Sequence, residues 1–357
     1  MSRDHDASAP GPSSVSVVNP LERSDWDRSI AAFPDAGIFH SVPWCRVLHE
    51  TYGYSPRYLV RSDGDRFHSA LPLMEVKSWL TGQRGVSLPF TDAVEPLCPD
   101  GKAFQSLFEA AQQLGRERRW KYLECRGGRT QLQGSVPAST RFYNHQLDLS
   151  AGEAKLFGQL DDSAQRAIRK AERSGLTLEF SQAPGAMRDF YTLLCETRQR
   201  HGVPPQPFEF FFKIQQHILT PNLGWVVLAR QGKTPIAGAV FFHFGRGAIY
   251  KFGASTRAHQ PLRANNLVMW QAIQRLAAEG FATLDFGRTS MNNEGLRRFK
   301  LGWGTRERVA EYVRFDFRQE TFVTATDDSS GWHNRVFNAL PTWASRPIGA
   351  FLYPHVG

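Results

Sequence analysis

The sequence predicts an α/β (α+β) chain of two tandem units that share one plan, followed by a C-terminal helical extension. With 357 residues, the chain is longer than one ordinary domain. Hydrophobic period and turn signals give the same order of elements twice. Each half also ends in an apolar strand, one carboxylate, and then glycine and arginine, with Glu124 in "RRWKYLECRGG" and Asp285 in "EGFATLDFGRT". We interpret this repeat as an internal duplication.

The first unit, 15–150, is expected to follow a flexible tail at 1–14 that is rich in Ser, Pro and Gly. An Asp-Gly turn in "DGDR" predicts a hairpin, and Pro43 and Gly53 mark the two ends of a helix. In chain order the predicted elements are strand "VSVV", helices "SDWDRSIAAF" and "PWCRVLHETYG", strands "PRYLVRS", "FHSALPLMEVKS" and "GVSLPF", a helix at 102–115, and strand "WKYLEC".

The second unit, 151–320, is expected to open with a basic helix at 163–174 that stops at Gly175. Its other predicted elements are strand "LTLEF", helices "MRDFYTLLCETRQRHG" and "FEFFFKIQQHIL", strands "WVVLAR", "IAGAVFFHFG" and "AIYKFGAS", a helix from about Asn265 to Glu279, and strand "ATLDFG". A linker and extension occupy 321–357. We expect "VFNALPTWASRPIGAFLYPHVG" to pack back on the second unit, with peripheral contact to the inner membrane as the alternative.

Composition indicates a globular, cytoplasmic protein. Hydrophobic residues make up 41% and aromatic residues 12%. No apolar run approaches the roughly 18 to 20 residues of a membrane-spanning helix, and the N-terminus has no apolar signal core. The four cysteines are far apart and the histidines lack metal-ligand spacing, so we expect reduced core thiols and no metal site. The oligomeric state stays open.

The charge balance predicts an anionic partner. Lys and Arg number 43 against 34 Asp and Glu, which gives a net charge of +9. The excess is concentrated at 115–129, 163–175 and 288–308. The helix at 163–174 places Arg166, Lys170 and Arg173 on one face. Such a face is either simply solvated or contacts RNA phosphates or a diphosphate-linked glycan.

Several motifs resemble a known family. In order, the chain contains "SAQRAIRKAERSGL", "YKFGAS", "ANNLVMWQAI", "LDFGR" and "GLRRFKLGWG". The repeated plan resembles the GNAT acyltransferase fold, and two such units in tandem resemble the Fem family of peptidoglycan aminoacyl transferases. "SLPFTDAVEPL" and "LPTWASRPIGAFLYPHVG" are more closely similar to FemAB-like proteins associated with exosortase (PEP-CTERM) exopolysaccharide systems. The resemblance implies two tandem GNAT-like acyltransferase domains.

The resemblance implies transfer of an activated acyl group to an amine of a peptidoglycan precursor or an exopolysaccharide. The acceptor would be a nucleotide- or lipid-linked sugar or peptide. The chain has no G-x-S-x-G elbow and no Cys with a local His, so a covalent acyl-enzyme is not expected. No permanently bound cofactor is expected. The acyl donor would be aminoacyl-tRNA or acyl-CoA, and both units lack the Q/R-x-x-G-x-G/A turn that holds coenzyme A, which favours aminoacyl-tRNA. Two alternatives remain: an acyl-CoA-dependent N-acetyltransferase of a sugar or small amine, and a non-catalytic polyanion-binding protein.

Lys300 and Asp92 are the predicted catalytic residues. Lys300 matches the lysine of the family's Phe-Lys motif and would bind a phosphate or stabilise developing negative charge. Its alternative is a solvated surface lysine. Asp92 follows a strand and would accept the proton of the amine, although a loop carboxylate near proline also caps turns.

Six further residues are expected to bind substrate. Arg288 follows "LDFG" and suits a phosphate or carboxylate, unless it pairs with Asp285 or Glu294. Tyr250 and Lys251 alternate on one strand, so one of the two should be structural. The others are Arg297, on the same helix face as Lys300, Trp303 in the same motif, and Asn265, which is also a good N-cap together with Asn266.

Overall fold

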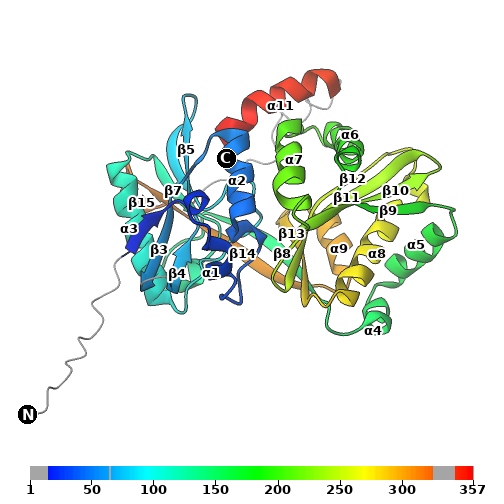
Figure 1. Ribbon diagram of the computed structural model, residues 1–357, viewed down its shortest axis with the longest axis horizontal. Coiled ribbons are helices and arrows are strands. Elements are labelled where there is room, and N and C mark those ends of the chain that lie inside the picture. Colours follow the sequence, from blue (N-terminus) through cyan, green and yellow to red (C-terminus); the bar gives the residue numbers. More distant parts are fainter. Residues whose placement is uncertain (1–14, 64–65, 325–341, 357) are drawn as a thin grey trace, which may run out of the picture.

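The computed structural model describes residues 15–63, 66–324 and 342–356. The predicted tail at 1–14, residues 64–65 of the "DGDR" turn and the linker at 325–341 lie outside the described residues. Within the described ranges, no helix is both long and apolar enough to cross a membrane. Figure 1 shows the two units side by side, with the first in blue and cyan and the second in green and yellow.

The first unit combines a small antiparallel sheet with one half of a large mixed sheet. The small sheet has the order β1-β3-β4. The strands of the first unit are β1 (Val15–Val18), β2 (Ser55–Pro56), β3 (Tyr58–Asp63), β4 (Arg66–Leu71), β5 (Met74–Ser78), β6 (Gly82–Val86), β7 (Tyr122–Cys125) and β8 (Thr140–Asp148). Its helices are η1 (Pro20–Glu22), α1 (Trp26–Ile30), η2 (Ile38–His40), α2 (Val42–Tyr52), α3 (Gly101–Glu117) and η3 (Arg129–Gln131).

Two predicted strands of the first unit are wrong in extent. The stretch "FHSALPLMEVKS" is two strands, β4 and β5, which belong to different sheets. The break falls at Pro72, which has no N–H to donate to a ladder. The stretch "GVSLPF" leaves the strand after Val86, and Leu88 and Phe90 adopt left-handed φ angles of 59° and 62°. Such angles are unusual for residues with a side chain.

The second unit repeats the order of helices, antiparallel strands and a final parallel strand. Its strands are β9 (Thr177–Ser181), β10 (Gly224–Gln231), β11 (Thr234–Phe244), β12 (Gly247–Ser255), β13 (Thr283–Ser290), β14 (Arg306–Asp316) and β15 (Thr321–Phe322). Its helices are α4 (Glu153–Gly158), α5 (Asp162–Glu172), α6 (Pro184–Arg200), α7 (Phe208–Ile214) with the continuing turn η4 (Gln215–Leu219), η5 (Gln260–Leu262), α8 (Ala264–Ala278), α9 (Glu294–Leu301) and the extension α11 (Thr342–Val356).

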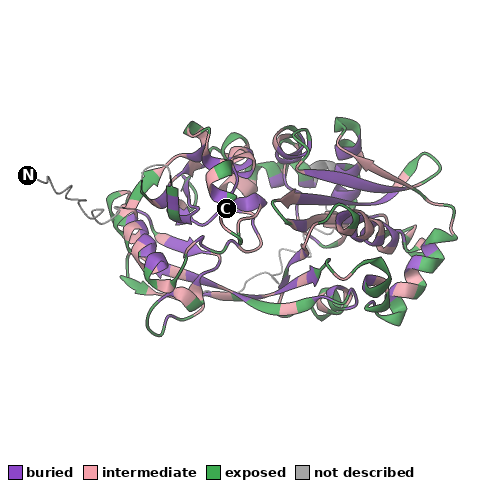
Figure 2. Cartoon of the chain, turned by 60° about the horizontal axis from the view of Figure 1, so that its bottom comes forward, coloured by how far each residue is buried: buried purple, intermediate pink, exposed green. Residues whose placement is uncertain are grey.

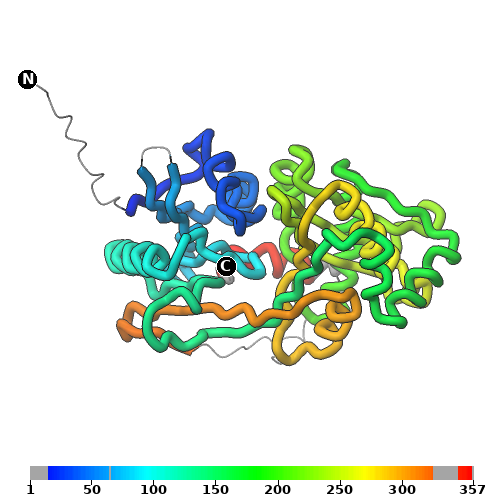
Figure 3. Tube along the Cα trace, turned by 90° about the horizontal axis from the view of Figure 1, so that it is seen from below, coloured from blue at the N-terminus to red at the C-terminus, as the bar shows by residue number. Residues whose placement is uncertain are grey.

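One continuous sheet joins the units. Its order is β2-β5-β6-β7-β14-β8-β13-β12-β11-β10-β9, with β15 beside β14. β8 of the first unit pairs with β13 of the second, and β14 of the second pairs with β7 of the first. β8 and β14 also pair with each other, and Figure 3 shows β14 (orange) running beside the first unit. The sequence analysis predicted neither β8 nor β14. The unit boundary at 150 stays a prediction, and the strands of this sheet pair across it.

A shared hydrophobic core packs the units against each other. Trp44 on α2 of the first unit contacts Phe210 and Phe242 of the second, with ring centroids 6.0 and 6.1 Å apart. Trp44, Phe210 and Phe242 are all fully buried. Figure 2 shows exposed residues gathered on the outer helices and buried residues along the strands. This apolar contact holds the facing surfaces of the two units in a fixed relation.

The extension is a helix, and it contacts both units. In the first unit, Tyr54 Oη donates to the carbonyl of Tyr353 at 3.2 Å and Arg84 donates to that of His355 at 2.7 Å. In the second unit, the Pro204 carbonyl accepts a hydrogen bond from Tyr353 Oη at 3.1 Å. The predicted packing on the second unit is therefore present, together with a contact to the first that the sequence analysis missed.

Candidate functional site

A cavity of about 970 Å³ lies between the two units. The first unit lines it with parts of segments 31–40 and 92–98 and with Asn144 and Gln146 on β8. The second unit lines it with the β11–β12 hairpin, the start of β13, and residues 308–310 of β14. Both units therefore contribute to one concave surface, which is the arrangement expected of a ligand site between domains.

The strands beneath this cavity diverge. The parallel pairing of β12 and β13 covers only three residue pairs and ends at Ile249 and Asp285. The pairing of β13 with β8 is irregular between Asp285 and Arg288, where Gly287 has a φ of 70°. A bulge of this kind re-aims side chains at a sheet and is over-represented next to active sites.

Asp285 lines the cavity at the point where the strands separate. Its carboxylate accepts hydrogen bonds from Asn144 Nδ2 at 3.1 Å to each oxygen and from the Gly287 N–H at 2.6 Å. Among the described residues, Asp285 forms no ion pair. Burial raises the pKa of Asp285, and the nearby negative charge of Asp92 acts in the same direction. A carboxyl group in this state can take up a proton above the ordinary Asp range.

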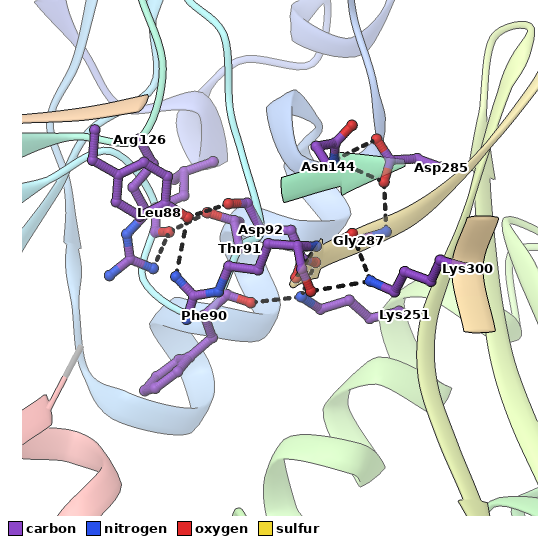
Figure 4. Close-up of polar contacts among 12 residues, drawn as sticks. Leu88, Phe90, Thr91, Asp92, Arg126, Asn144, Lys251, Asp285, Gly287 and Lys300 are labelled. Carbon is purple, nitrogen blue, oxygen red and sulfur yellow. Dashed lines mark hydrogen bonds and ion pairs between the residues drawn. The ribbon is translucent and has the colours of Figure 1, made fainter. Parts of the chain in front are cut away.

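Asp92 reaches the same cavity from the first unit. Its Oδ2 pairs with Lys251 Nζ at 2.7 Å, and Lys251 also donates to the carbonyl of Phe90 at 2.8 Å. Figure 4 shows Lys251 between Phe90 and Asp92, with Asp285 on the opposite side of Gly287. Although burial alone would raise the pKa of Asp92, Lys251 and Arg288 hold it below its ordinary value. The two predicted residues Asp92 and Lys251 are thus brought together as an ion pair across the two units.

Lys300 lies beneath the bulge, and it does not line the cavity. Its Nζ donates to the carbonyls of Gly287 at 2.7 Å and Arg288 at 3.1 Å, and the residue is only 3% exposed. Burial lowers the pKa of Lys300 to about 8. Lys300 is therefore not the solvated surface lysine of the alternative interpretation. It fastens the bulge whose Gly287 N–H holds Asp285.

Arg288 pairs with neither of the carboxylates proposed from sequence. Its guanidinium donates to Tyr312 Oη at 3.0 Å and lies 4.4 Å from the centre of the Phe142 ring. Tyr312 in turn donates to the backbone carbonyl of Asp92. Arg288 therefore connects the bulge with the Asp92 loop, and its side chain is exposed to solvent.

Tyr250 and Trp303 lie on the opposite side of the sheet from Asp92. Tyr250 packs against Phe241 and Phe286, with centroids 5.5 and 6.1 Å apart, and burial raises its pKa to about 12. Trp303 is 1% exposed and packs in the same core. As the alternation of the strand predicted, Tyr250 and Lys251 do not face one cleft. The structure gives Trp303 a core position.

Arg297 and Asn265 form structural contacts. Arg297 donates two hydrogen bonds to Glu307, at 2.7 and 2.8 Å. Asn265 donates to Ser255 Oγ at 3.1 Å. The predicted capping role of Asn265 is wrong, because α8 begins at Ala264 and its N-cap is Arg263, in the left-handed region. Asn265 therefore lies in the first turn, where its amide ties α8 to the end of β12.

The basic face of α5 is open to solvent. Arg166, Lys170 and Arg173 are all exposed, as predicted, while Ala164 and Ile168 are buried. In Figure 1, α5 lies at the outer end of the second unit, and none of these three basic residues lines the cavity. Its proposed contact with a polyanion stays a prediction.

Cys98 is a cysteine of the cavity wall. Burial raises the pKa of its thiol to about 12, so the thiol is protonated at neutral pH. A protonated thiol is a poor nucleophile. Within the described residues, no group of three or more His, Cys, Asp and Glu side chains could hold a metal ion.

Two residues of the candidate site were missed by the sequence analysis as candidates: Asp285 and Asn144. Asp285 was noted only as the repeat of Glu124 and as a pairing partner for Arg288. A usable signal was present, because a carboxylate that ends a buried strand in both halves marks equivalent positions of a duplicated fold. No comparable signal marked Asn144, since its strand was not predicted.

Comparisons with known proteins bear on the fold of this chain. Residues 162–307 match the family model of the acetyltransferase (GNAT) domain. The search of curated proteins finds no match. A crystal structure of FemX is similar at a TM-score of 0.69 and 14% identity, covering 85% of this chain and 98% of that one.

Two further solved structures are similar to this chain. The C-terminal domain of a putative lysylphosphatidylglycerol synthetase from Agrobacterium fabrum has a TM-score of 0.56 at 14% identity, covering 82% of this chain and 90% of that one. A tandem GNAT protein from the clavulanic acid biosynthesis pathway has a TM-score of 0.53 at 11% identity, covering 85% and 98%.

The fold is that of tandem GNAT proteins. The predicted fold class is thereby confirmed, and the predicted acyltransferase class is confirmed at the level of the matched domain. The matched segment contains β12, β13 and Asp285. The domain that matches the acetyltransferase model therefore also forms one wall of the cavity. The association with exopolysaccharide systems stays a prediction.

Proposed function

We propose that this protein transfers an activated acyl or aminoacyl group to an amine of a cell-envelope acceptor, and that the amine binds in the cavity between the units. One observation carries the proposal: two carboxylates, Asp92 from the first unit and Asp285 from the second, line the same cavity above diverging strands. An ammonium group is attracted by such a pair, and it must lose a proton before it can attack a carbonyl.

The reaction can proceed without a protein nucleophile. In this mechanism Asp285 accepts a proton from the acceptor ammonium, and the free amine nitrogen attacks the acyl carbon of the donor. The new C–N bond forms as the C–O or C–S bond of the donor breaks. The nitrogen passes its second proton to the departing hydroxyl or thiol, and Asp285 releases the first proton to solvent. Asp285 suits the first step because burial raises its pKa toward that of an amine.

Lys300 has a supporting role in this proposal. Its ammonium donates hydrogen bonds to the carbonyls of Gly287 and Arg288 and so holds the bulge that positions Asp285. It also places a positive charge near the reacting centre below pH 8 or so, where a developing oxyanion would gain from it. Asp92, held by Lys251, would bind the ammonium before it is deprotonated.

Aminoacyl-tRNA is the donor that we propose. Neither unit has the glycine-rich turn that holds a pyrophosphate, and α5 presents an exposed basic face that suits an RNA backbone. The similar structures named FemX and lysylphosphatidylglycerol synthetase support an acceptor of the cell envelope. The acceptor proposed is a peptidoglycan precursor or an exopolysaccharide sugar with a free amine.

A second candidate function is acyl-CoA-dependent N-acetylation of a sugar or small amine. The observation that favours it is the match of residues 162–307 to an acetyltransferase domain. The donor separates the two candidates, because the cavity and its carboxylates would serve either acceptor.

The experiment incubates the purified full-length protein with amine acceptors and either charged tRNA or acetyl-CoA, and records the mass of the acceptor. We expect an aminoacyl mass shift with charged tRNA alone. An acetyl shift with acetyl-CoA alone would replace the first candidate by the second. If no donor is consumed while the protein still binds RNA through Arg166, Lys170 and Arg173, the non-catalytic polyanion-binding alternative holds.

A further inference from the structure

The β5–β6 hairpin projects from the first unit and ends in exposed apolar side chains. Trp79 is 78% exposed and Leu80 is 52% exposed. In Figure 1 the hairpin stands above the body of the first unit, on the same side of the molecule as α11. Single exposed apolar residues are common on protein surfaces, but a cluster at a projecting tip marks an interaction site.

The end of α11 extends this cluster. Phe351 is 54% exposed, and its ring lies 6.3 Å from that of Trp79. The His355 ring lies 5.5 Å from Trp79, and the His355 carbonyl accepts a hydrogen bond from Thr81 Oγ1 at 2.9 Å. Trp79, Leu80 and Phe351 therefore form one patch, which we call the tip patch.

Positive charge borders the tip patch. Lys77 lies near the end of β5, two residues before Trp79 in the hairpin turn, and its side chain is 54% exposed. Lys121 Nζ donates to the carbonyl of Thr81 at 2.8 Å, at the turn of the hairpin. Lys77 Nζ lies 3.9 Å from the fully buried carboxylate of Glu75, and that one carboxylate also pairs with Arg57 at 3.6 Å and Arg118 at 2.9 Å. The edge of the patch therefore carries a net positive charge.

We propose that the tip patch docks on the surface of an anionic phospholipid bilayer. Trp79, Leu80 and Phe351 would enter the interfacial layer, and Lys77 and Lys121 would lie at the lipid phosphates. A protein partner fits less well, because a stable protein interface buries on the order of 1,000 Å² or more and three side chains do not supply such an area. A few apolar side chains combined with basic ones are sufficient for a bilayer surface. This inference goes beyond the proposed function and does not depend on it.

The test is co-sedimentation of the full-length protein with vesicles of phosphatidylcholine, either alone or mixed with phosphatidylglycerol. We expect binding to the mixed vesicles that weakens at high salt. The double substitution Trp79→Ser and Leu80→Ser should lower the partition coefficient by at least roughly tenfold. Lys77→Gln and Lys121→Gln should each lower it about fivefold at low salt.

Matched control variants lie away from the tip patch. Val17→Ser changes an apolar residue that is 48% exposed on β1, and Lys233→Gln removes an exposed charge at the β10–β11 turn. Both should bind vesicles like the wild type. Equal binding to neutral and mixed vesicles, or unchanged binding of the Trp79/Leu80 variant, would overturn the proposal. So would a dimer in light scattering that this variant dissociates, because the patch would then contact a second copy. Transferase assays do not enter this test, so the two proposals can fail separately.

Discussion

Each unit contains a pair of diverging parallel strands with a carboxylate at its end. The two carboxylates have opposite electrostatic environments. In the first unit, β6 and β7 pair through Val86 and Glu124, and Glu124 forms ion pairs with Arg126 and Arg314. In the second unit, β12 and β13 pair through Ile249 and Asp285, and amide groups are the hydrogen-bond partners of Asp285. The strand positions are equivalent but the charge environments are not.

The pKa values of the two carboxyl groups shift in opposite directions because of this difference. Burial would raise the pKa of Glu124, but the two arginines hold it below its ordinary value. Burial raises the pKa of Asp285 and no arginine reverses the effect. One copy of the repeated motif is closed by structural ion pairs, and the other places at a cavity a carboxyl that amide groups hold. In the proposed function, the carboxyl of the second copy accepts the proton and that of the first copy has a structural role.

The largest effect should follow from Asp285→Asn. Removing the proposed proton acceptor should lower kcat/KM by about 10²- to 10⁴-fold, the usual contribution of a general base. In the wild type, the acid limb of the kcat/KM profile should lie above the ordinary Asp pKa, because burial raises that of Asp285. This limb should be absent from the variant. Steady-state kinetics across pH would measure both. A loss of less than threefold or so would contradict the assignment.

Next in size is the loss of the ion pair that joins the units. Lys251→Met leaves Asp92 without its cation, and we expect the free energy of unfolding to fall by about 3 kcal/mol, as for one broken buried pair. The matched control is Lys213→Met, which breaks the more exposed pair with Glu50 and should cost about 1 kcal/mol or less. Urea titration would measure both variants. Equal losses would show that the Asp92–Lys251 pair contributes no more to the free energy of unfolding than the more exposed Lys213–Glu50 pair does.

Glu124→Gln should destabilise the protein without removing its activity. It leaves Arg126 and Arg314 unpaired, so the free energy of unfolding should fall by roughly 2 to 3 kcal/mol. The kcat/KM of the folded variant should stay within about twofold of the wild type. A loss of turnover as large as that of Asp285→Asn would contradict the assignment of a structural role to Glu124 and a catalytic role to Asp285.

A smaller effect concerns Lys300 and pH. Its pKa is about 8 in the folded state, against an ordinary value of 10.5. Between these values the unfolded chain binds more protons, so this group makes stability increase as pH rises through that window. Below pH 8 or so the buried charge is a cost. The increase is at most about 3.4 kcal/mol, because the pKa difference of about 2.5 units corresponds to about 1.36 kcal/mol per unit.

The measurement is the difference between wild type and Lys300→Met. Tyr and Cys side chains with raised pKa values oppose the increase in both proteins, so they cancel in this difference. Parallel urea titrations from pH 7 to 10 should show the wild type gaining on the variant. A constant difference would mean that the Lys300 pKa is not lowered.

Much of the fold could be predicted from local pattern. Helix α2 has its proline and glycine signals, and the hydrophobic strands of the second unit alternate or run apolar as buried strands do. β8 and β14 were not found in this way. In "RERVAEYVRFD" six of the eleven residues are charged, which hides the apolar pattern of a strand, and its first three residues belong to the basic stretch at 288–308. Their pairing is also non-local, and no window of sequence reports which strand lies next to which.

The site was predicted in part. Asp92 lies at the cavity, but its ion pair with Lys251, which was expected to bind substrate, was not predicted. Lys300 was expected to face a ligand, but its ammonium faces two backbone carbonyls. The position of these carbonyls depends on the path of the bulge, which the motif does not show. Asp285 was not proposed as a site residue, because the sequence does not show that the side chain beside it on the neighbouring strand is the amide of Asn144 and not an arginine.

The most direct test of the central claim places a bulky group in the cavity between the units. In a Cys98→Ser background, Val309→Cys introduces a thiol at the cavity wall, where Val309 is 51% exposed, and Asn292→Cys introduces one at an exposed site away from it. Both variants are then treated with a polyethylene-glycol maleimide and assayed for acyl transfer. We predict that the Val309 variant loses nearly all turnover and that excess acceptor protects it, while the Asn292 variant stays active. Full activity of both labelled proteins would contradict the claim that the acceptor amine reacts in this cavity.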